Sequence, residues 1–295
     1  MIRELTVISG KGGTGKTSIV ASFAVLAERA VLADCDVDAA DLHLILSPEV
    51  ERREIFRGGR GAVIRQDDCV ACGDCLELCR FGAITAEPLG VDRRRYVIDP
   101  IGCEGCGVCV RFCPVQAIDF PEQVSGELYV SQTRCGPMVH ARLGVAAENS
   151  GKLVTAVRKQ AREICEREER PLLIVDGPPG IGCPVIASIT GASQVLIVTE
   201  PTLSGEHDLD RVLSLARHFR ITAAVCVNKW DLNPSLADRM EESARARGAS
   251  IAGRVPYDPD VTRAQVQGKA VVEYGGEASR EIRRLWEKLQ GAGEG

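Results

Sequence analysis

The chain has 295 residues, of which 45% are hydrophobic and 26% charged, so it can bury the core of one large or two medium domains. The 36 basic and 41 acidic residues give a net charge of −5, which argues against nucleic acid as a partner because a nucleic-acid coat needs a basic surface. No apolar run approaches the length of a membrane span, and the first one leads directly into a glycine-rich motif. We therefore expect a cytoplasmic protein without stable membrane insertion.

The predicted secondary structure alternates between apolar strands and amphipathic helices. Short apolar runs predict buried parallel strands at Glu4–Ser9, Ala30–Ala33, Leu172–Val175, Val195–Val198, Ala223–Val227 and Ile251–Val255. Helices are expected at Thr17–Ala27, Leu153–Arg167 (with Ser150 as its N-cap), Leu209–His218 and Ser279–Gln290. This alternation predicts an α/β fold with a doubly wound, mostly parallel sheet.

The first predicted strand is followed by GKGGTGKT, which matches the phosphate-loop pattern G-x-x-x-x-G-K-[ST] at a strand-to-helix junction. In such a P-loop NTPase motif the backbone N–H groups converge on the phosphates. Lys16 is expected at the β- and γ-phosphates and the Thr17 hydroxyl at Mg²⁺. The residues assigned here to nucleotide binding are Gly10, Lys11, Gly12, Gly13, Thr14, Gly15, Lys16 and Thr17.

Lys11 is a second lysine in this loop, although the whole chain has only seven. The loop thereby resembles the deviant Walker A motif of the MinD/ParA/Mrp ATPases and, more distantly, that of the nitrogenase iron protein. The resemblance implies ATP and Mg²⁺ as cofactors and catalytic roles for Lys11 and Lys16. It also implies an ATP-sandwich dimer in which Lys11 reaches the phosphates of the other subunit, either a second copy (a homodimer) or a related ATPase (a heterodimer).

Two acidic segments follow predicted strands. Asp36 lies where the resembling family has its first switch and is assigned to the attacking water, while Asp34 and Asp38 are either part of this site or solvated loop carboxylates. Asp176 follows an apolar strand and precedes Gly177-Pro178-Pro179-Gly180, so it is expected to hold a Mg²⁺-bound water before a turn that resembles the second switch.

A base-recognition element is expected near the end of the chain. Asn228, in Asn228-Lys229-x-Asp231, is the predicted adenine contact, and Asp231 is interpreted as a turn cap. Pro256 is expected to line the adenine side as well.

The strand–helix alternation breaks between about residues 60 and 120, where two similar halves are dense in Cys, Gly and Arg. We therefore predict a first part of the P-loop ATPase domain at 1–60, an inserted small α+β domain at 61–120 and the second part of the ATPase domain at 121–295. Gly58, Gly59 and Gly61 are expected to form the linker into the insert, and 121–126 the linker out of it.

Eight of the thirteen cysteines follow the spacing of a bacterial ferredoxin, C-x₂-C-x₂-C-x₃-C, twice over. In that arrangement the fourth cysteine of each run ligates the other cluster, which predicts two [4Fe-4S] clusters. The expected ligands of cluster 1 are Cys69, Cys72, Cys75 and Cys113, and those of cluster 2 are Cys79, Cys103, Cys106 and Cys109. Zinc is the alternative, but zinc modules usually separate two cysteine pairs by a longer spacer. Arg80 follows Cys79 where the motif usually has Pro, a departure that concerns the turn rather than the ligands.

The remaining cysteines raise the question of a third cluster. Cys165 and Cys226 lie in apolar patterns and are interpreted as buried, as Cys35 is too. Cys183 lies seven residues after Asp176, and the resemblance to the nitrogenase iron protein implies a cluster-ligating cysteine at that position. Cys135 is the candidate for the second ligand from the same subunit. A [4Fe-4S] cluster shared across a dimer and a purely structural role for both are the alternatives, and the structural role is favoured.

The last predicted helix places apolar residues on one face and a mixture of Arg and Glu on the other, which favours packing against the sheet over membrane binding. The chain as a whole resembles MinD-superfamily ATPases with an inserted two-cluster, ferredoxin-like domain. That resemblance implies MgATP hydrolysis coupled to electron transfer, with a redox or cluster-accepting protein partner. The alternatives are an ATP-dependent metallocluster assembly or carrier factor and a ParA/MinD-type positioning ATPase.

Overall fold

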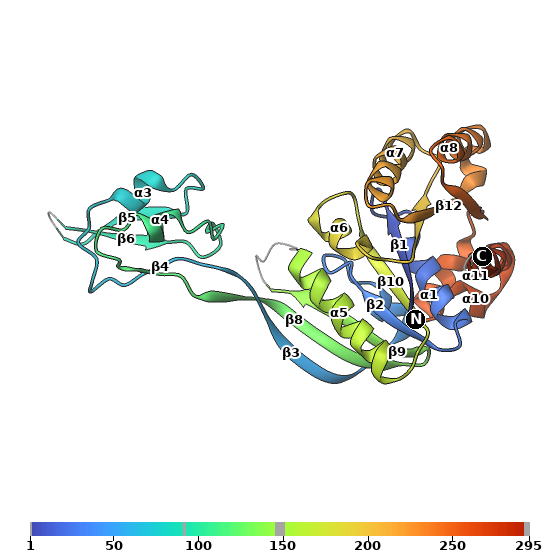
Figure 1. Ribbon diagram of the computed structural model, residues 1–295, viewed down its shortest axis with the longest axis horizontal. Helices are drawn as coiled ribbons and strands as arrows, with labels where there is room; N and C mark the ends of the chain where they lie inside the picture. The colour runs from blue at the N-terminus through green and yellow to red at the C-terminus, as the bar shows by residue number, and fades with distance from the viewer. Residues whose placement is uncertain (1, 91–92, 145–150, 292–295) are drawn as a thin grey trace. The chain divides into compact units, whose positions relative to one another are not determined.

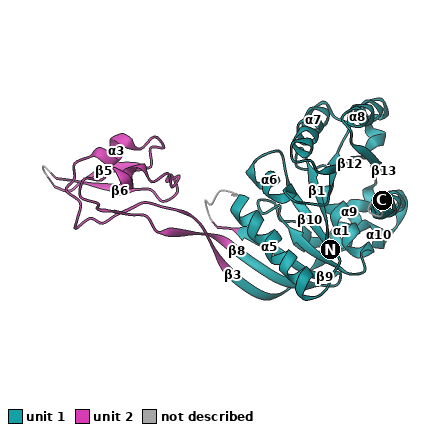
Figure 2. Cartoon of the chain, viewed as in Figure 1, with its two compact units in different colours: residues 1–54, 127–142, 149–295 teal, residues 55–126, 143–148 magenta. Residues whose placement is uncertain are grey.

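The computed structural model describes residues 2–90, 93–144 and 151–291, and its chain divides into two compact units (Figures 1 and 2). Unit 1 comprises residues 1–54, 127–142 and 149–295. Unit 2 comprises residues 55–126 and 143–148. The sequence of unit 2 thus interrupts that of unit 1.

A nine-stranded sheet organises unit 1, in the order β13-β12-β11-β1-β10-β2-β9-β8-β3. All neighbouring pairs from β13 to β9 are parallel. Its strands are β1 (Arg3–Ser9), β2 (Ala30–Asp34), β3 (Glu49–Arg60), β8 (Glu122–Thr133), β9 (Gly136–Leu143), β10 (Leu172–Pro179), β11 (Gln194–Thr199), β12 (Thr222–Asn228) and β13 (Ser250–Val255). The fold is therefore the predicted α/β arrangement with a mostly parallel sheet.

Helices cover both faces of this sheet, because each presents one apolar stripe to it. On one face α1, α2, α9, α10 and α11 share a core with the strands, and on the other α6, α7 and α8 do so, with α5 packed beside α6. Their bounds are α1 (Lys16–Leu26), α2 (Leu42–Leu46), α5 (Gly151–Arg167), α6 (Cys183–Ile189), α7 (Leu203–His218), η1 (Trp230–Leu232), α8 (Pro234–Ala246), α9 (Pro259–Val266), α10 (Val271–Tyr274) and α11 (Gly276–Gly291). Ser150, the predicted N-cap of α5, lies outside the described residues.

The six strands predicted from apolar runs are confirmed, whereas β3, β8 and β9 were not predicted. The side chains of β3 are almost all exposed and many are charged, because β3 is the last strand of the sheet. An edge strand has no second neighbouring strand, and charged side chains protect it from pairing with another chain. It therefore has no apolar run by which it could be predicted. Gly58 and Gly59, expected in a linker, lie within β3, and most of the expected second linker lies within β8.

The last helix packs as predicted. Ile282, Leu285, Trp286 and Leu289 are buried in α11, and the Trp286 ring lies 4.9 Å from that of Phe23 in α1. Among the described residues, no helix is both long and apolar enough to cross a membrane.

Unit 2 is built from two similar halves around a small core. Its elements are β4 (Val63–Ile64), α3 (Asp74–Leu78), β5 (Ile84–Pro88), β6 (Arg94–Ile98), α4 (Val108–Arg111) and β7 (Ile118–Asp119), with β4 antiparallel to β7 and β5 antiparallel to β6. Gly73 and Gly107 precede the two short helices with φ of 91° and 72°, a backbone conformation that favours glycine. The core is formed by Ala62, Ile64, Ile84, Tyr96 and Ile118.

Candidate functional site

The phosphate loop connects the end of β1 to the start of α1, as the sequence predicts. Gly15 caps α1 with φ of 87°, and a Cβ atom there would lie 2.3 Å from Asn228 Nδ2. Both the backbone conformation and the close approach therefore require glycine. The loop directs the N-terminal end of α1, with its unpaired backbone N–H groups, towards a cavity.

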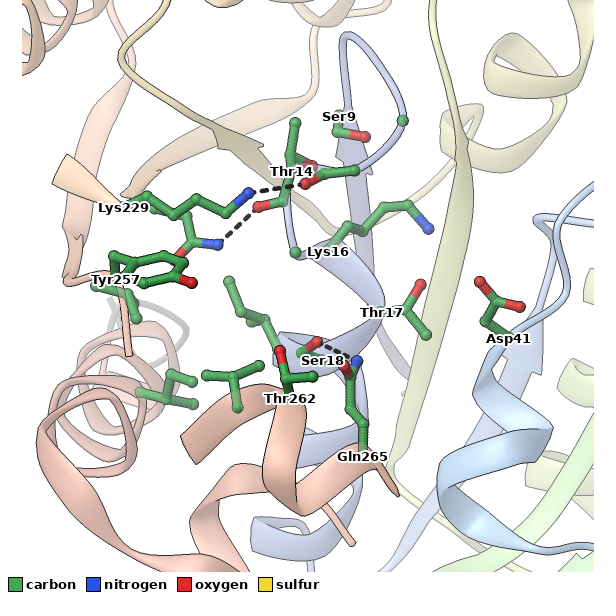
Figure 3. A pocket seen from close by; sticks show the side chains of 18 of the residues that line it. Ser9, Thr14, Lys16, Thr17, Ser18, Asp41, Lys229, Tyr257, Thr262 and Gln265 are labelled. Carbon is green, nitrogen blue, oxygen red and sulfur yellow. Dashed lines mark hydrogen bonds between the residues drawn. The ribbon is translucent and has the colours of Figure 1, made fainter. Parts of the chain in front are cut away.

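That cavity has a volume of about 410 Å³. Figure 3 shows Thr14, Lys16 and Thr17 across from Tyr257 and Thr262. Of the predicted nucleotide-site residues, the lining includes Gly12, Gly13, Thr14, Gly15, Lys16, Thr17, Asp36, Asn228 and Pro256. Segments from both ends of the chain thus meet at the carboxyl edge of the parallel sheet, where α/β folds bind ligands.

An ion cluster lies at the inner end of the cavity. The Lys16 ammonium group pairs with Asp176 and lies 3.2 Å from Asp36 Oδ2. Burial lowers the pKa of Lys16, but the charges of Asp176 and Asp36 outweigh it, so the pKa is raised overall. Burial, together with the charge of Asp176, raises the pKa of Asp34 well above its ordinary value, and burial also raises the pKa of Asp36.

The carboxylates of this cluster keep oxygens that make no hydrogen bond within the described part of the chain. Among the described residues, Asp34 Oδ2, Asp36 Oδ1 and Asp176 Oδ2 are buried without a hydrogen-bond partner. Three carboxylates face one lysine, so the group carries excess negative charge when ionised. Carboxylate and hydroxyl oxygens are the ligands that Mg²⁺ prefers, and Thr17 lines the same cavity.

On the other side of the cavity, Asn228 makes a contact that the sequence did not predict. Its side-chain Nδ2 donates to the Thr14 carbonyl at 2.7 Å, so it braces the phosphate loop in addition to lining the cavity. Lys229 Nζ donates to the Gly13 carbonyl at 3.1 Å (Figure 3). Asp231 accepts a hydrogen bond from the backbone N–H of Tyr257 at 2.6 Å, which agrees with its interpretation as a turn cap.

Sequence analysis missed the wall contributed by α9. Thr262 and Gln265 line the cavity, and Gln265 Nε2 donates to Ser18 Oγ at 2.8 Å (Figure 3). These residues carry no motif, because only the packing of α9 with α10 and α11 brings them to the phosphate loop. Lys229 also lines the cavity and was not predicted to do so. Its position next to Asn228 in the sequence could have indicated it. Lys11 is not part of the described lining and instead contacts Glu200.

In unit 2 the eight ferredoxin-type cysteines line two separate cavities. One is lined by Cys69, Cys72, Cys75 and Cys113, and the other by Cys79, Cys103, Cys106 and Cys109. Each set joins three cysteines of one run to the fourth of the other, the same grouping that the spacing predicts. Six of the eight are partly buried against the core of unit 2, whereas Cys72 and Cys106 are exposed.

Each of these cavities presents four thiols. All eight thiols are free, and the backbone N–H of Ala117 donates to Cys113 Sγ at 3.3 Å. Within the described ranges, no three Cys, His, Asp or Glu side chains lie close enough to hold one metal ion. Four thiolates are ligands that suit either an iron–sulfur cluster or a zinc ion.

Cys135 and Cys183 lie apart from each other. β9, β2 and β10 run parallel, so their amino ends lie together and their carboxyl ends lie together. The start of β9 and the end of β10 are therefore at opposite ends of the strands. Cys135 directly precedes β9 and packs against the core, whereas Cys183 begins α6 beyond β10 and is exposed. One subunit cannot bring both thiols to the same cluster in this arrangement, so the bridging cluster does not fit the structure.

The three other cysteines, Cys35, Cys165 and Cys226, are buried, which confirms their interpretation as core residues. Burial raises the pKa of the Cys165 thiol to about 11 and that of Cys226 to about 12. Both are therefore protonated at neutral pH and are poor metal ligands.

Comparison with known proteins places this site in a family. The model of the CobQ/CobB/MinD/ParA nucleotide-binding domain matches residues 5–271. An uncharacterized protein of Methanocaldococcus jannaschii, MJ0578, is 31% identical over 98% of this chain and 97% of its own length. The septum site-determining protein MinD of Pyrococcus horikoshii, solved with Mg-ADP, superposes with a TM-score of 0.60 at 15% identity, over 100% of this chain and 98% of its own.

A shorter match concerns a different protein. The pyruvate synthase subunit PorD of Methanothermobacter marburgensis is 38% identical over 53 residues, which is 18% of this chain and 56% of PorD.

The fold, the phosphate loop and the family match agree over most of the sequence. The chain belongs to the CobQ/CobB/MinD/ParA nucleotide-binding family.

Proposed function

We propose that this protein is an ATPase that couples the binding and hydrolysis of MgATP, with nucleotide-dependent dimerisation, to electron transfer between protein partners through two [4Fe-4S] clusters in unit 2. The observation that carries the proposal is the partition of eight free cysteines into two cavities of four. Bound there, the clusters would supply one-electron carriers. The protein's contribution is to hold the thiolates and to set their exposure to solvent.

The packing of the cysteines favours resident clusters over a transferred cargo. Six of the eight thiols contact the small apolar core of unit 2, which contains Ile64, Ile84 and Ile118. Removing a cluster would therefore disturb the core that holds the unit together, because small domains depend on such internal ligation. This observation supports electron transfer rather than the carrier alternative.

In the nucleotide site the proposed roles follow the ion cluster. Lys16 binds the β- and γ-phosphates after exchanging its contact with Asp176 for a phosphate oxygen, and Thr17 and Asp176 hold Mg²⁺ and its water. Asp36 orients the attacking water, since one of its oxygens has no partner among the described residues. Lys11 acts at the phosphates of the second subunit.

The order of the segments along the chain supports the coupling. Unit 2 begins after the Asp36 segment and its main part ends before Asp176. Its sequence therefore lies between the two segments expected to respond to the γ-phosphate. β3 and β8, which lead into and out of this insert, are both strands of the nine-stranded sheet.

The test measures iron, acid-labile sulfide and electron-transfer rate on anaerobically purified full-length protein. We expect about eight irons per chain, and a rate of electron transfer to an external acceptor that changes on adding MgATP. Cluster potentials and transfer rates that are the same with and without MgATP would overturn the coupling. Activation of an apo-acceptor protein in the presence of ATP would instead identify a cluster carrier, and ATP-dependent sedimentation with liposomes or DNA a positioning ATPase.

A further inference from the structure

A second cavity lies in unit 1, apart from the nucleotide cavity. Its volume is about 420 Å³, close to the 410 Å³ of the nucleotide cavity. Small-molecule sites in proteins typically have volumes in this range. Its walls come from the segment between β2 and α2, from α2 and from the neighbouring strands β8 and β9.

One turn contributes to both cavities. Asp36 and Ala39 line the nucleotide cavity, whereas Val37 and Ala40 line the second cavity. The backbone N–H of Ala39 donates to the Asp36 carbonyl at 3.0 Å, so these residues form one compact turn. A ligand in the second cavity would therefore contact the turn that carries Asp36, on the segment that leads to Asp41 at the nucleotide cavity (Figure 3).

His140 offers a hydrogen-bond donor in the second cavity. Its Nε2 atom lies 2.9 Å from the Oγ atom of the buried Ser131, which leaves Nδ1 as the ring nitrogen with which it can contact a ligand. Burial, with the charge of His43, lowers the pKa of His140 to about 4, so the ring is neutral at neutral pH. When Ser131 donates to Nε2, the ring proton is on Nδ1. The ring is stacked on that of Tyr129, with 5.0 Å between the centroids, which holds its orientation.

Arg142 supplies a positive charge to the same cavity. Hydrogen bonds from Arg53 and Tyr129 lower the pKa of Glu127, and the charge of Arg142 contributes less. The ion pair of Glu127 is with Arg53, and Arg142 forms no ion pair with another described residue. Its guanidinium group is therefore available to a ligand.

Hydrogen-bond donors outnumber acceptors in this lining. Arg142, His43 and His140 can all donate, whereas an ionised Asp38 can only accept. The hydroxyl of Tyr129 already donates to Glu127. The guanidinium fork of arginine matches the paired oxygens of a carboxylate or a phosphate.

We propose that the second cavity binds a small organic anion, held through its carboxylate or phosphate oxygens by Arg142 and His140, and that its occupancy changes the affinity of the adjacent site for nucleotide. The shared turn is the physical link, because a ligand that contacts it more favourably in one nucleotide state stabilises that state. The coupling is reciprocal, so nucleotide changes the affinity for the anion by the same factor. The proposal requires nucleotide binding, but neither hydrolysis nor the proposed electron transfer.

The first test uses the four histidines of the chain as reporters. Long-range proton–nitrogen NMR spectra of the imidazole rings are recorded while succinate or, in a separate arm, glycerol 3-phosphate is added to protein saturated with MgADP. We expect saturable shifts at His43 and His140 but none at His207 and His218, which line neither cavity. A response to succinate identifies a carboxylate ligand, and a response to glycerol 3-phosphate identifies a phosphate ligand. No shift with either probe at millimolar concentration, or equal shifts at all four histidines, overturns the proposal.

Variants then locate the anion. In Arg142→Gln we expect the anion to bind about tenfold more weakly, because a charge-assisted contact is lost. His43→Gln, at an exposed position, should weaken binding by less. Arg239→Gln is the matched control, since Arg239 pairs with Glu206 and lines neither cavity. Equal affinity in Arg142→Gln and Arg239→Gln would contradict the assignment.

The coupling is tested by titrating a fluorescent ATP analogue at increasing concentrations of the anion that binds. Succinate and glycerol 3-phosphate suit this titration because they chelate Mg²⁺ weakly. We expect the dissociation constant of the analogue to change about fivefold and then reach a plateau, and to stay constant in Arg142→Gln over the same range. A dissociation constant that rises without limit would show competition at the phosphate loop and refute the second site. An unchanged constant, with the shifts at His43 and His140 present, would refute the coupling. Iron content and electron-transfer rates are not measured in these tests, so their failure leaves the proposed function standing.

Discussion

The Lys16 ammonium group and the Asp176 carboxylate form a buried ion pair at the inner end of the nucleotide cavity. Lys16 begins α1, which follows β1 through the phosphate loop, and Asp176 lies in β10, which pairs with β1 in the sheet. The pair keeps Lys16 extended towards the site of the phosphates. Because Asp176 also has an unpartnered oxygen among the described residues, it can exchange the lysine for a cation when nucleotide binds.

Replacing Asp36 should separate hydrolysis from binding. In Asp36→Asn we expect the rate of phosphate release to fall by about 100-fold, because the amide cannot accept a proton from the attacking water, while ATP binding is retained. Since burial raises the pKa of Asp36, the wild-type rate should also fall on acidification at a higher pH than for an exposed aspartate, whose pKa is about 4. Steady-state phosphate release and equilibrium binding of a fluorescent ATP analogue measure both. Equal loss of binding and hydrolysis would contradict the assignment.

Asn228 should act on the phosphate loop rather than on the base. Asn228→Ala removes the hydrogen bond to the Thr14 carbonyl, and we expect about 1 kcal/mol lower stability and weaker binding of both ATP and GTP by similar factors. Competition titrations against a fluorescent nucleotide check this. A loss confined to ATP would restore Asn228 as an adenine contact.

The two cysteine cavities predict which thiols bind iron. Cys113→Ser should lower the iron content from about eight to about four per chain, because Cys113 lines the cavity of Cys69, Cys72 and Cys75. Cys183→Ser is the control and should retain about eight, since Cys183 lines neither cysteine cavity. Iron and sulfide analysis with electron paramagnetic resonance of the reduced proteins measures both variants. About ten irons in wild type that fall in Cys183→Ser would contradict this expectation and establish a shared third cluster.

His140 should make unit 1 sensitive to acid. Burial, with the charge of His43, lowers the pKa of His140 to about 4. Below about pH 6.5 the unfolded chain binds a proton that the folded chain does not bind until about pH 4. The free energy of unfolding is therefore highest above pH 6.5 and falls as the pH is lowered from 6.5 to 4. We expect the loss to be about 1–2 kcal/mol, because His140 is partly exposed. Urea unfolding followed by the fluorescence of Trp230 and Trp286, both in unit 1, measures this. His140→Gln should remove this part of the pH dependence, and an identical slope in both proteins would refute the assignment.

Local sequence determined the features that depend on short stretches of chain. The apolar runs of β1, β2, β10, β11, β12 and β13 predicted the parallel strands, because a strand covered by helices on both faces is apolar throughout. GKGGTGKT predicted the phosphate loop, because its glycines have to provide a left-handed backbone and the close approach seen at Gly15. The cysteine spacing predicted the grouping that lines the two cavities, because the turns between neighbouring ligands are local.

Tertiary structure decided what depends on residues far apart in sequence. Exposed, charged β3 is a strand only because β8 provides its neighbour, and Gln265 reaches Ser18 only because α9 packs beside α1. The same holds for Cys135 and Cys183: their spacing allowed a shared cluster, but the parallel arrangement places them at opposite ends of the strands. Glu200 carries no motif, and its contact with Lys11 and Lys229 exists because β1, β11 and β12 are neighbours whose carboxyl ends meet at one edge.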